Sequence, residues 1–401
     1  MTRASALDYA PIAAPLFDGV MLGGFECSCH RLADGRRLDL LASTRHDELA
    51  AGDYERLRAA GFSGARDGVP WVRVQRENGA YDFASVEPVV RAAERAALPV
   101  CWDLMHFGWP DDVDVFSSAF VRQFGRYANA FASWLADETD SSTMIAPINE
   151  ISFLSWAGGD VRYLNPFCAG RGLELKKQLV RASIEAIEAV RSVIPQARFL
   201  QPEPLIHVLP EGDGVQAKAE AEAERVLQFQ AWDMLAGRDS PELGGRPEYL
   251  DILGVNFYPY NQFVRGRGPI GRDDPRYRPF SQMLLEVSAR YSRPVIVAET
   301  GTEDEGRVPW LRYVTDECIA ALERGCQLHA VTLYPVVNHP GWGDDRHCHN
   351  GLWDYADAQG HRPVFEPLLE ELRQQSERLH AARSLMLGGS VKPPSSQGAT
   401  R

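Results

Sequence analysis

The sequence Leu98-Pro-Val-Cys-Trp-Asp-Leu occupies residues 98–104, and a second apolar segment, Met144-Ile-Ala-Pro-Ile-Asn, occupies residues 144–149. Between them, aromatic residues recur at steps of four and three, the spacing of one face of an α-helix: Phe120, Phe124, Tyr127, Phe131 and Trp134. Two short apolar strands joined by an amphipathic helix form a βαβ unit with parallel strands. This stretch therefore predicts an α/β fold whose helical stripe is core.

The same alternation extends along most of the chain. Eight apolar segments predict strands at residues 20–26, 64–67, 98–104, 144–149, 197–202, 250–258, 294–299 and 329–335. Their nearly continuous apolar character is typical of strands that are buried on both faces. We expect a single-domain (β/α)8 TIM barrel over residues 1–386. Residues 387–401 are rich in Gly, Pro and Ser, which predicts a disordered C-terminal tail.

Composition restricts the possible partners. The 401 residues are 45% hydrophobic and carry a formal charge of −13, so the chain can bury a core but repels phosphate backbones and anionic lipids. We expect no nucleic-acid partner and no membrane partner. Because the N-terminus shows no signal peptide and no apolar run spans a bilayer, we expect a cytoplasmic protein. The seven cysteines lack CxxC spacing, which indicates reduced thiols.

Polar residues gather where the predicted strands end, which is where (β/α)8 barrels place their active sites. They are Arg66, His106, Asn149, Glu150, Asn256, Tyr258 and Glu299. A single strand-end Glu usually caps a helix or pairs with a cation, but two carboxylates with an Arg and a Tyr favour catalysis. Retaining glycoside hydrolysis needs one carboxylic acid and one nucleophilic carboxylate about 5–5.5 Å apart. Arg66 and Tyr258 would keep such a nucleophile ionised.

The chain resembles glycoside hydrolase family 1, within the larger clan of retaining (β/α)8 glycosidases. The resemblance runs in order over most of residues 17–357, through the segments that contain Arg66, His106, the Asn149-Glu150 pair, Asn256-Phe-Tyr258 and Val297-Ala-Glu299-Thr-Gly. It implies that Glu150 is the acid/base and Glu299 the nucleophile. It also implies that Arg66 and Tyr258 contact the nucleophile, and that His106, Asn149 and Asn256 lie in the substrate site.

The sequence departs from the family pattern at the sugar contacts. In place of the family's first-strand Gln, the segment Gly23-Gly-Phe-Glu26-Cys-Ser-Cys-His30 offers Glu26 or His30. Gly341 stands where the family has a sugar-binding Glu, directly before Trp342, which we expect to contact substrate. Thr300 replaces the usual Asn after the nucleophile. The resemblance therefore implies the clan more firmly than the family, and it does not identify the sugar.

These observations predict an exo-acting retaining β-glycosidase, similar to β-glucosidases, that acts on a small-molecule glycoside or oligosaccharide without cofactor or metal. A transglycosidase or tailoring enzyme with the same carboxylate pair is an alternative, as is a non-catalytic glycoside-binding barrel. The segment 344–349 contains His347, Cys348 and His349 and leaves a metal site open, although we prefer substrate contact there. Glu203 could contact substrate or pair with an Arg. Residues 265–272 are expected to form a mobile lid or a solvated loop.

Overall fold

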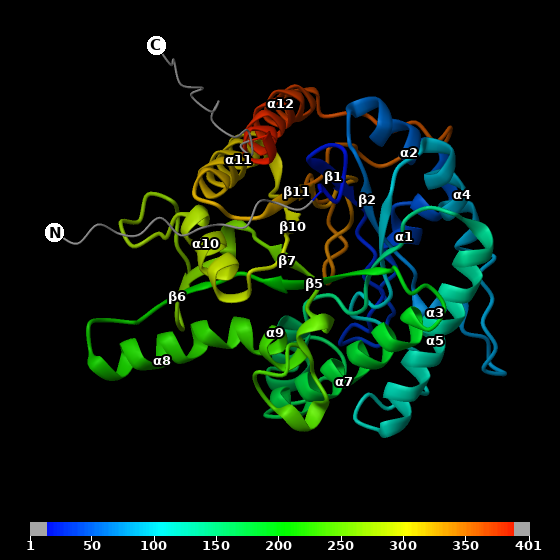
Figure 1. Cartoon of the computed structure of the whole chain (residues 1–401), viewed down its shortest axis with the longest axis horizontal. Helices are drawn as coiled ribbons and strands as arrows, with labels where there is room; N and C mark the ends of the chain where they lie inside the picture. Colours follow the sequence, from blue (N-terminus) through cyan, green and yellow to red (C-terminus); the bar gives the residue numbers. More distant parts are fainter. Residues whose placement is uncertain (1–13, 389–401) are drawn as a thin grey trace, which may run out of the picture.

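The computed structural model describes residues 14–388, and Figure 1 shows helices arranged around a central group of strands. Eight parallel strands close into a barrel in the order β1-β11-β10-β7-β5-β4-β3-β2. The barrel strands are β1 (Met21–Gly24), β2 (Ala65–Gly68), β3 (Val100–Asp103), β4 (Met144–Ala146), β5 (Arg198–Pro204), β7 (Ile252–Asn256), β10 (Val295–Thr300) and β11 (Leu328–Leu333). The predicted (β/α)8 barrel is confirmed, and each predicted strand overlaps one of these eight.

Helices follow the strands on the outside of the barrel (Figure 1). The longer ones are α2 (His46–Ala60), α4 (Glu87–Ala96), α5 (Ser118–Glu138), α7 (Gly172–Arg191), α8 (Val215–Val226), α10 (Phe280–Tyr291), α11 (Arg307–Glu323) and α12 (Glu366–Gly388). Shorter helices are α1 (Leu40–Ser43), α3 (Trp71–Val74), α6 (Ile151–Leu154) and α9 (Gln230–Leu235), and a π-helical turn, η1 (Ser155–Asp160), continues α6. Helix α5 packs against α7, and α11 packs against α12.

The apolar core has two layers. Alternate strand positions, such as Met144 and Ala146 of β4, fill the barrel interior, while the opposite faces pack against the helices. Burial on both faces explains why the strands read as continuous apolar runs. On α5 the predicted stripe is core: four of its aromatic side chains are fully buried and Trp134 is partly buried.

Local signals set the helix ends near the barrel mouth and floor. The Ser117 hydroxyl accepts a hydrogen bond from the Phe120 backbone N–H and caps α5. Helix α2 ends at Gly61, whose φ of 91° lies in the left-handed region that glycine adopts without strain. Gly24, at the end of β1, is required for space and not for backbone conformation, since a Cβ there would lie 2.0 Å from the Tyr334 ring.

Two segments differ in part from expectation. Residues 265–272 are mostly exposed, as expected of a solvated loop, but they include β9 (Gly268–Pro269), which joins β8 (Gln262–Val264) and β6 (His207–Leu209) in a separate three-stranded sheet. Arg265 forms ion pairs with Glu220 and Glu224 of α8, which holds the segment against that helix. Helix α12 extends to Gly388, so residues 387 and 388 are helical; the remaining predicted tail, 389–401, lies outside the described residues.

Two further properties concern the whole described chain. Within residues 14–388, no helix combines the length and the apolar character that a membrane crossing requires. All seven cysteines are free, and six of them are buried. The unpaired thiols agree with the absence of CxxC spacing in the sequence.

Candidate active site

Closure of the parallel barrel brings the predicted polar residues to one end. Arg66 belongs to β2 and Glu299 to β10, Asn256 ends β7, and the Asn149-Glu150 pair lies just beyond β4. These five side chains, with His106 after β3 and Tyr258 after β7, form one connected set of hydrogen bonds. The structure therefore assembles side chains that are far apart in sequence into a single site.

Each carboxylate oxygen of Glu299 has a donor. Arg66 Nη1 lies 2.7 Å from Oε1, and the Tyr258 hydroxyl donates to Oε2 at 2.8 Å. The side chain is 5% exposed. A guanidinium and a phenol directed at the two oxygens stabilise the ionised carboxylate and hold its plane in one orientation.

Arg66 is buried, and each of its five N–H groups has an acceptor. Besides Glu299 and the Ala298 carbonyl, it donates to both oxygens of Asp103 at 3.0 and 2.7 Å and to Asn149 Oδ1 at 2.7 Å. A guanidinium with no free donor cannot rotate without losing several contacts. Arg66 therefore fixes the positions of Glu299, Asp103 and Asn149 relative to one another.

These contacts determine the proton on His106. Because Arg66 can only donate, Asn149 must present its oxygen to Arg66, so its Nδ2 donates to His106 Nε2 at 3.0 Å. His106 Nδ1 then donates to Asp103 Oδ2 at 3.0 Å. In this hydrogen-bond arrangement Nδ1 carries a proton and Nε2 accepts. Burial lowers the pKa of the ring, but the charge of Glu26 and the bond to Asp103 raise it above its ordinary value overall.

Glu150 lies in a different environment. It is partly exposed, adopts a left-handed backbone with φ of 46°, and accepts one hydrogen bond from Asn256 Nδ2 at 3.0 Å on Oε1. The strained backbone turns its side chain away from the strand direction at the start of α6. Burial and then the charge of Glu299 raise the pKa of Glu150 well above its usual range.

The two carboxylates are thus in unequal states. Burial also raises the pKa of Glu299, but Arg66 and His106 oppose that rise, and no guanidinium is bonded to Glu150. The pKa of Glu150 is raised further than that of Glu299, so Glu150 keeps a proton to higher pH than Glu299 does.

Glu26 and Trp342 lie at the same end of the barrel. Glu26 Oε1 accepts hydrogen bonds from the Ser28 backbone N–H at 2.9 Å and hydroxyl at 2.5 Å, and it lies 3.7 Å from His106 Nε2. The Trp342 ring makes edge contacts with the rings of His30 and Phe107, at centroid distances of 4.9 and 5.7 Å. All nine residues expected in the site are therefore gathered around one barrel mouth.

One contributor was not identified from the sequence. Asp103 holds both Arg66 and His106, and its position at the end of β3 is the signal that could have marked it.

Among the described residues, Glu203 forms no ion pair with an Arg, which was one of the two contacts expected for it. Its carboxylate accepts the Ser152 backbone N–H in α6, at 3.0 Å from Oε2. Burial raises the pKa of Glu203 to about 7, although the Ser152 bond and Lys176 oppose the rise.

Ligand types for a metal occur twice in the described part of the chain. Cys27, Asp103 and His106 form a poor set, because burial raises the pKa of the Cys27 thiol well above its usual range and Asp103 is already bonded to Arg66. The second set combines His347 and His349 of segment 344–349 with Asp354. His347 Nε2 contacts Asp354 Oδ1 at 2.6 Å. This distance is that of an ordinary hydrogen bond, so His347 and Asp354 are already paired with each other.

Exposed aromatic side chains surround the mouth beside Glu150. Trp156 in η1, Tyr163 after it and Tyr260 after β7 are each at least half exposed. The Tyr260 ring stacks on Tyr258, with centroids 5.4 Å apart. Flat exposed rings next to an acid are suited to stack on a sugar or an aromatic leaving group.

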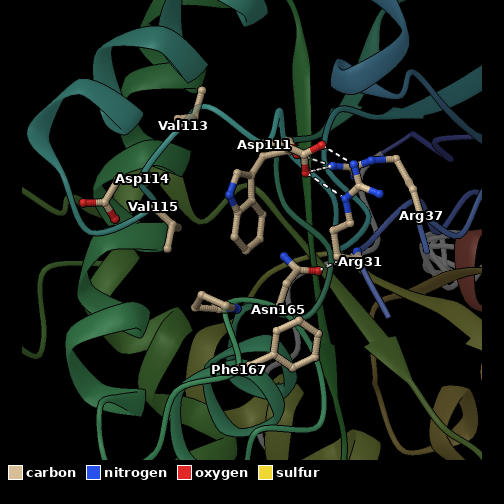
Figure 2. A pocket seen from close by; sticks show the side chains of 10 residues that line it. Arg31, Arg37, Asp111, Val113, Asp114, Val115, Asn165 and Phe167 are labelled. Carbon is tan, nitrogen blue, oxygen red and sulfur yellow. Dashed lines mark hydrogen bonds and ion pairs between the residues drawn. The ribbon is translucent and has the colours of Figure 1, made fainter. Parts of the chain in front are cut away.

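A separate pocket of about 250 Å³ lies outside this set of residues. Figure 2 shows Asp111 joined to both Arg31 and Arg37 on one side, with Asn165 and Phe167 facing them. Neither Glu150 nor Glu299 lines it. Arg31 and Arg37 are already paired with Asp111, so we assign the pocket no chemistry.

No protein-family model and no curated protein sequence matches the chain. Solved structures do match over nearly its whole length. The AHE enzyme from Alicyclobacillus herbarius is 16% identical, with 92% of this chain and 99% of that chain covered at a TM-score of 0.74. The family 1 β-glucosidase from Thermotoga maritima is 12% identical (92% and 98%, TM-score 0.73), and the β-glycosidase from Pyrococcus horikoshii is 16% identical (96% and 97%, TM-score 0.70). The fold is therefore that of family 1 β-glucosidases.

Proposed function

We propose that this protein is an exo-acting retaining β-glycosidase, in which Glu299 is the nucleophile and Glu150 the general acid and then base. The observation that carries the proposal is the unequal pair of carboxylates: Glu299 bonded to Arg66 and Tyr258, and Glu150 bonded only to the Asn256 amide. Retaining hydrolysis needs this division into an ionised and a protonated group. The β-glycosidase fold and the ordered motifs support the same reaction class.

In the first step, a Glu299 oxygen attacks the anomeric carbon of the bound glycoside. The bond between that carbon and the leaving oxygen breaks, and the proton of Glu150 moves to the leaving oxygen. Because Glu150 Oε1 accepts from Asn256, the acid's proton belongs on Oε2. The products are a covalent glycosyl ester on Glu299 and a free alcohol.

In the second step, Glu150 is a carboxylate and acts as base. It takes a proton from a water molecule, whose oxygen attacks the anomeric carbon as the ester bond to Glu299 breaks. Arg66 and Tyr258 stabilise the carboxylate that is released. The two inversions together retain the configuration of the sugar.

The remaining residues bind the substrate. Asn149 is held in one orientation by Arg66 and His106, which leaves the second hydrogen of its Nδ2 for a sugar hydroxyl. His106 is fixed by Asp103 and packs beside it. Trp342 supplies an aromatic edge of the same pocket. The exposed rings of Trp156, Tyr163 and Tyr260 would support the leaving group outside it. The substrate class is a small-molecule glycoside or an oligosaccharide.

Trapping of the covalent intermediate tests the proposal. The purified protein is incubated with 2-deoxy-2-fluoro glycosides that carry activated leaving groups, in gluco, galacto, manno, fuco and xylo forms. We expect an adduct of the mass of the fluorosugar, mapped to the peptide that contains Glu299. The Glu299→Gln variant is the control and should give none. No adduct with any probe, or an adduct on another residue, would contradict the assignment of Glu299.

Leaving-group dependence tests the acid separately. In Glu150→Gln, aryl glycosides with good leaving groups should lose much less kcat/KM than substrates with poor leaving groups, because only the latter need a proton during bond cleavage. Equal losses on both classes would contradict the role of Glu150. Added alcohols distinguish hydrolysis from transfer: a transglycosidase would form a new glycoside from the trapped sugar faster than it releases the sugar to water.

A further inference from the structure

Glu26 is a buried carboxylate without a strong cationic partner. Its side chain is 7% exposed, and both hydrogen bonds from Ser28 reach the same oxygen, Oε1. Among the described residues, no Lys or Arg nitrogen lies within 4.0 Å of it, and His106 at 3.7 Å is the one basic group in that range. An ionised carboxylate in such a setting is costly unless a positive charge approaches it.

The surrounding charges are also unbalanced. With Glu150 protonated, the pocket holds three carboxylates, Glu26, Asp103 and Glu299, against the single guanidinium of Arg66. Asp103 and Glu299 both bond to that guanidinium, whereas Glu26 does not. The pocket therefore has an excess of negative charge, and Glu26 is the carboxylate that remains unpaired.

The chain can supply the missing charge only at the expense of another contact. Although burial lowers it, the pKa of His106 lies above its ordinary value because Glu26, Asp103 and Glu299 favour a second proton on the ring. That proton would sit on Nε2, which already accepts the Asn149 amide at 3.0 Å. Two donors would then face each other, and Asn149 cannot turn over because its oxygen is bonded to Arg66.

The neighbouring histidines do not remove the imbalance. His30 is fully buried, and neither ring nitrogen has a partner. Burial lowers the pKa of His30 to about 4, so the ring is neutral at neutral pH. His339 Nδ1 lies 2.8 Å from the Pro340 carbonyl and its Nε2 lies 3.0 Å from Asn350 Nδ2, so both ring nitrogens are engaged by neighbours other than Glu26. Glu26 is thus a nearly buried carboxylate that lies near a buried, unpartnered polar ring.

We propose that the glycone of the natural substrate carries a primary ammonium group, as in an amino sugar, and that this group binds Glu26 through Oε2. The inference rests on the proposed glycosidase function for the identity of the ligand. An ammonium at Glu26 supplies the positive charge that the three carboxylates favour and leaves the contact between Asn149 and His106 intact.

A neutral sugar is the competing occupant, since a carboxylate also accepts hydrogen bonds from hydroxyls. The two differ in one measurable respect: exchange of a hydroxyl for an ammonium at the correct ring position strengthens the contact with Glu26 only if that charge is unpaired. Charge-assisted hydrogen bonds are roughly twice as strong as neutral ones. An ammonium should therefore be preferred over a hydroxyl by about tenfold or more.

The test compares matched aryl β-glycosides that differ only in a hydroxyl or a primary amine at C2, C3, C4 or C6 of the sugar. At about pH 6, where such amines are protonated, kcat/KM should be at least about tenfold higher for one amine than for its hydroxyl partner. In Glu26→Gln, which keeps the shape and removes the charge, that ratio should fall to about one or below. Asp34→Asn removes an exposed charge from the loop that follows β1 and should keep the wild-type ratio.

Binding distinguishes this inference from the proposed function. Calorimetric titration of the wild-type protein with methyl 1-thio-β-glycosides, which resist cleavage, measures the same preference without turnover. Tighter binding of one amine than of its hydroxyl partner, lost in Glu26→Gln, would support the inference even if no fluoroglycoside labels Glu299. Preference for the hydroxyl at every position, or a preference for the amine that persists in Glu26→Gln, would overturn it while leaving the glycosidase assignment intact.

Discussion

The hydrogen bond from Tyr258 to Glu299 should set the acid side of the pH–rate profile. The hydroxyl donates to Oε2 at 2.8 Å, and a donor to the charged form of a carboxylate lowers its pKa. Removal of this donor in Tyr258→Phe should therefore raise the pKa of Glu299. The nucleophile must be ionised to attack, so the acid limb of kcat/KM should move to higher pH.

The size of the shift follows from the strength of the lost bond. A hydrogen bond to a charged group contributes about 1.5–3 kcal/mol, and Tyr258 is partly exposed, which favours the lower end of that range. About 1.5 kcal/mol corresponds to about one pH unit. Arg66 still bonds Oε1 in the variant, so the carboxylate keeps its cation and the shift stays well below that of a lost ion pair.

The measurement is kcat/KM across about pH 4–9 on the substrate that the trapping experiment identifies, since this parameter reports ionisations of the free enzyme. Tyr334→Phe is the matched control. It removes a phenol hydroxyl at the same end of the barrel that donates to the Phe25 carbonyl and not to Glu299. An acid limb that is unchanged in Tyr258→Phe, moves to lower pH, or moves equally in the control would refute the reasoning.

Two further predictions concern other parts of the molecule. The charge of Glu203 contributes to the raised pKa of Glu150, so Glu203→Gln should lower that pKa and move the alkaline limb of kcat/KM to lower pH; a limb that stays in place would show that this charge is not felt. Phe124 on α5 is fully buried, and Phe124→Ala should reduce the free energy of unfolding by about 3–5 kcal/mol in chemical denaturation, whereas a loss below about 1 kcal/mol would contradict its place in the core.

Much of the fold followed from local patterns. A strand covered by helices on one side and by the barrel interior on the other needs apolar residues at nearly every position, and this requirement is visible at residues 144–146 and 295–298. The aromatic stripe of α5 and the glycine after α2 are similarly local signals. The small sheet beside segment 265–272 could not be predicted locally, because β8 pairs with β6, a strand more than fifty residues earlier in the chain.

The candidate site, too, was predictable from the sequence only in part. Glu150, Glu299, Arg66 and Tyr258 were found because they follow predicted strands and because a parallel barrel collects strand ends at one mouth. The contact between Glu203 and Ser152 was not predicted, because it depends on how α6 is placed above β5. The role of Asp103 and the hydrogen-bond pattern of His106 likewise come from several contacts taken together.

By itself, the sequence determined the succession of strands and helices and the residues that occupy the strand ends, because these depend on the burial pattern of neighbouring positions. Only the tertiary structure decided which side chain donates to which oxygen. Arg66 and Glu299 are 233 positions apart, and their 2.7 Å contact exists because eight strands close with one particular register. That register is set by packing over the whole barrel, and so are the hydrogen-bond partners of Glu299, Glu150 and Glu26.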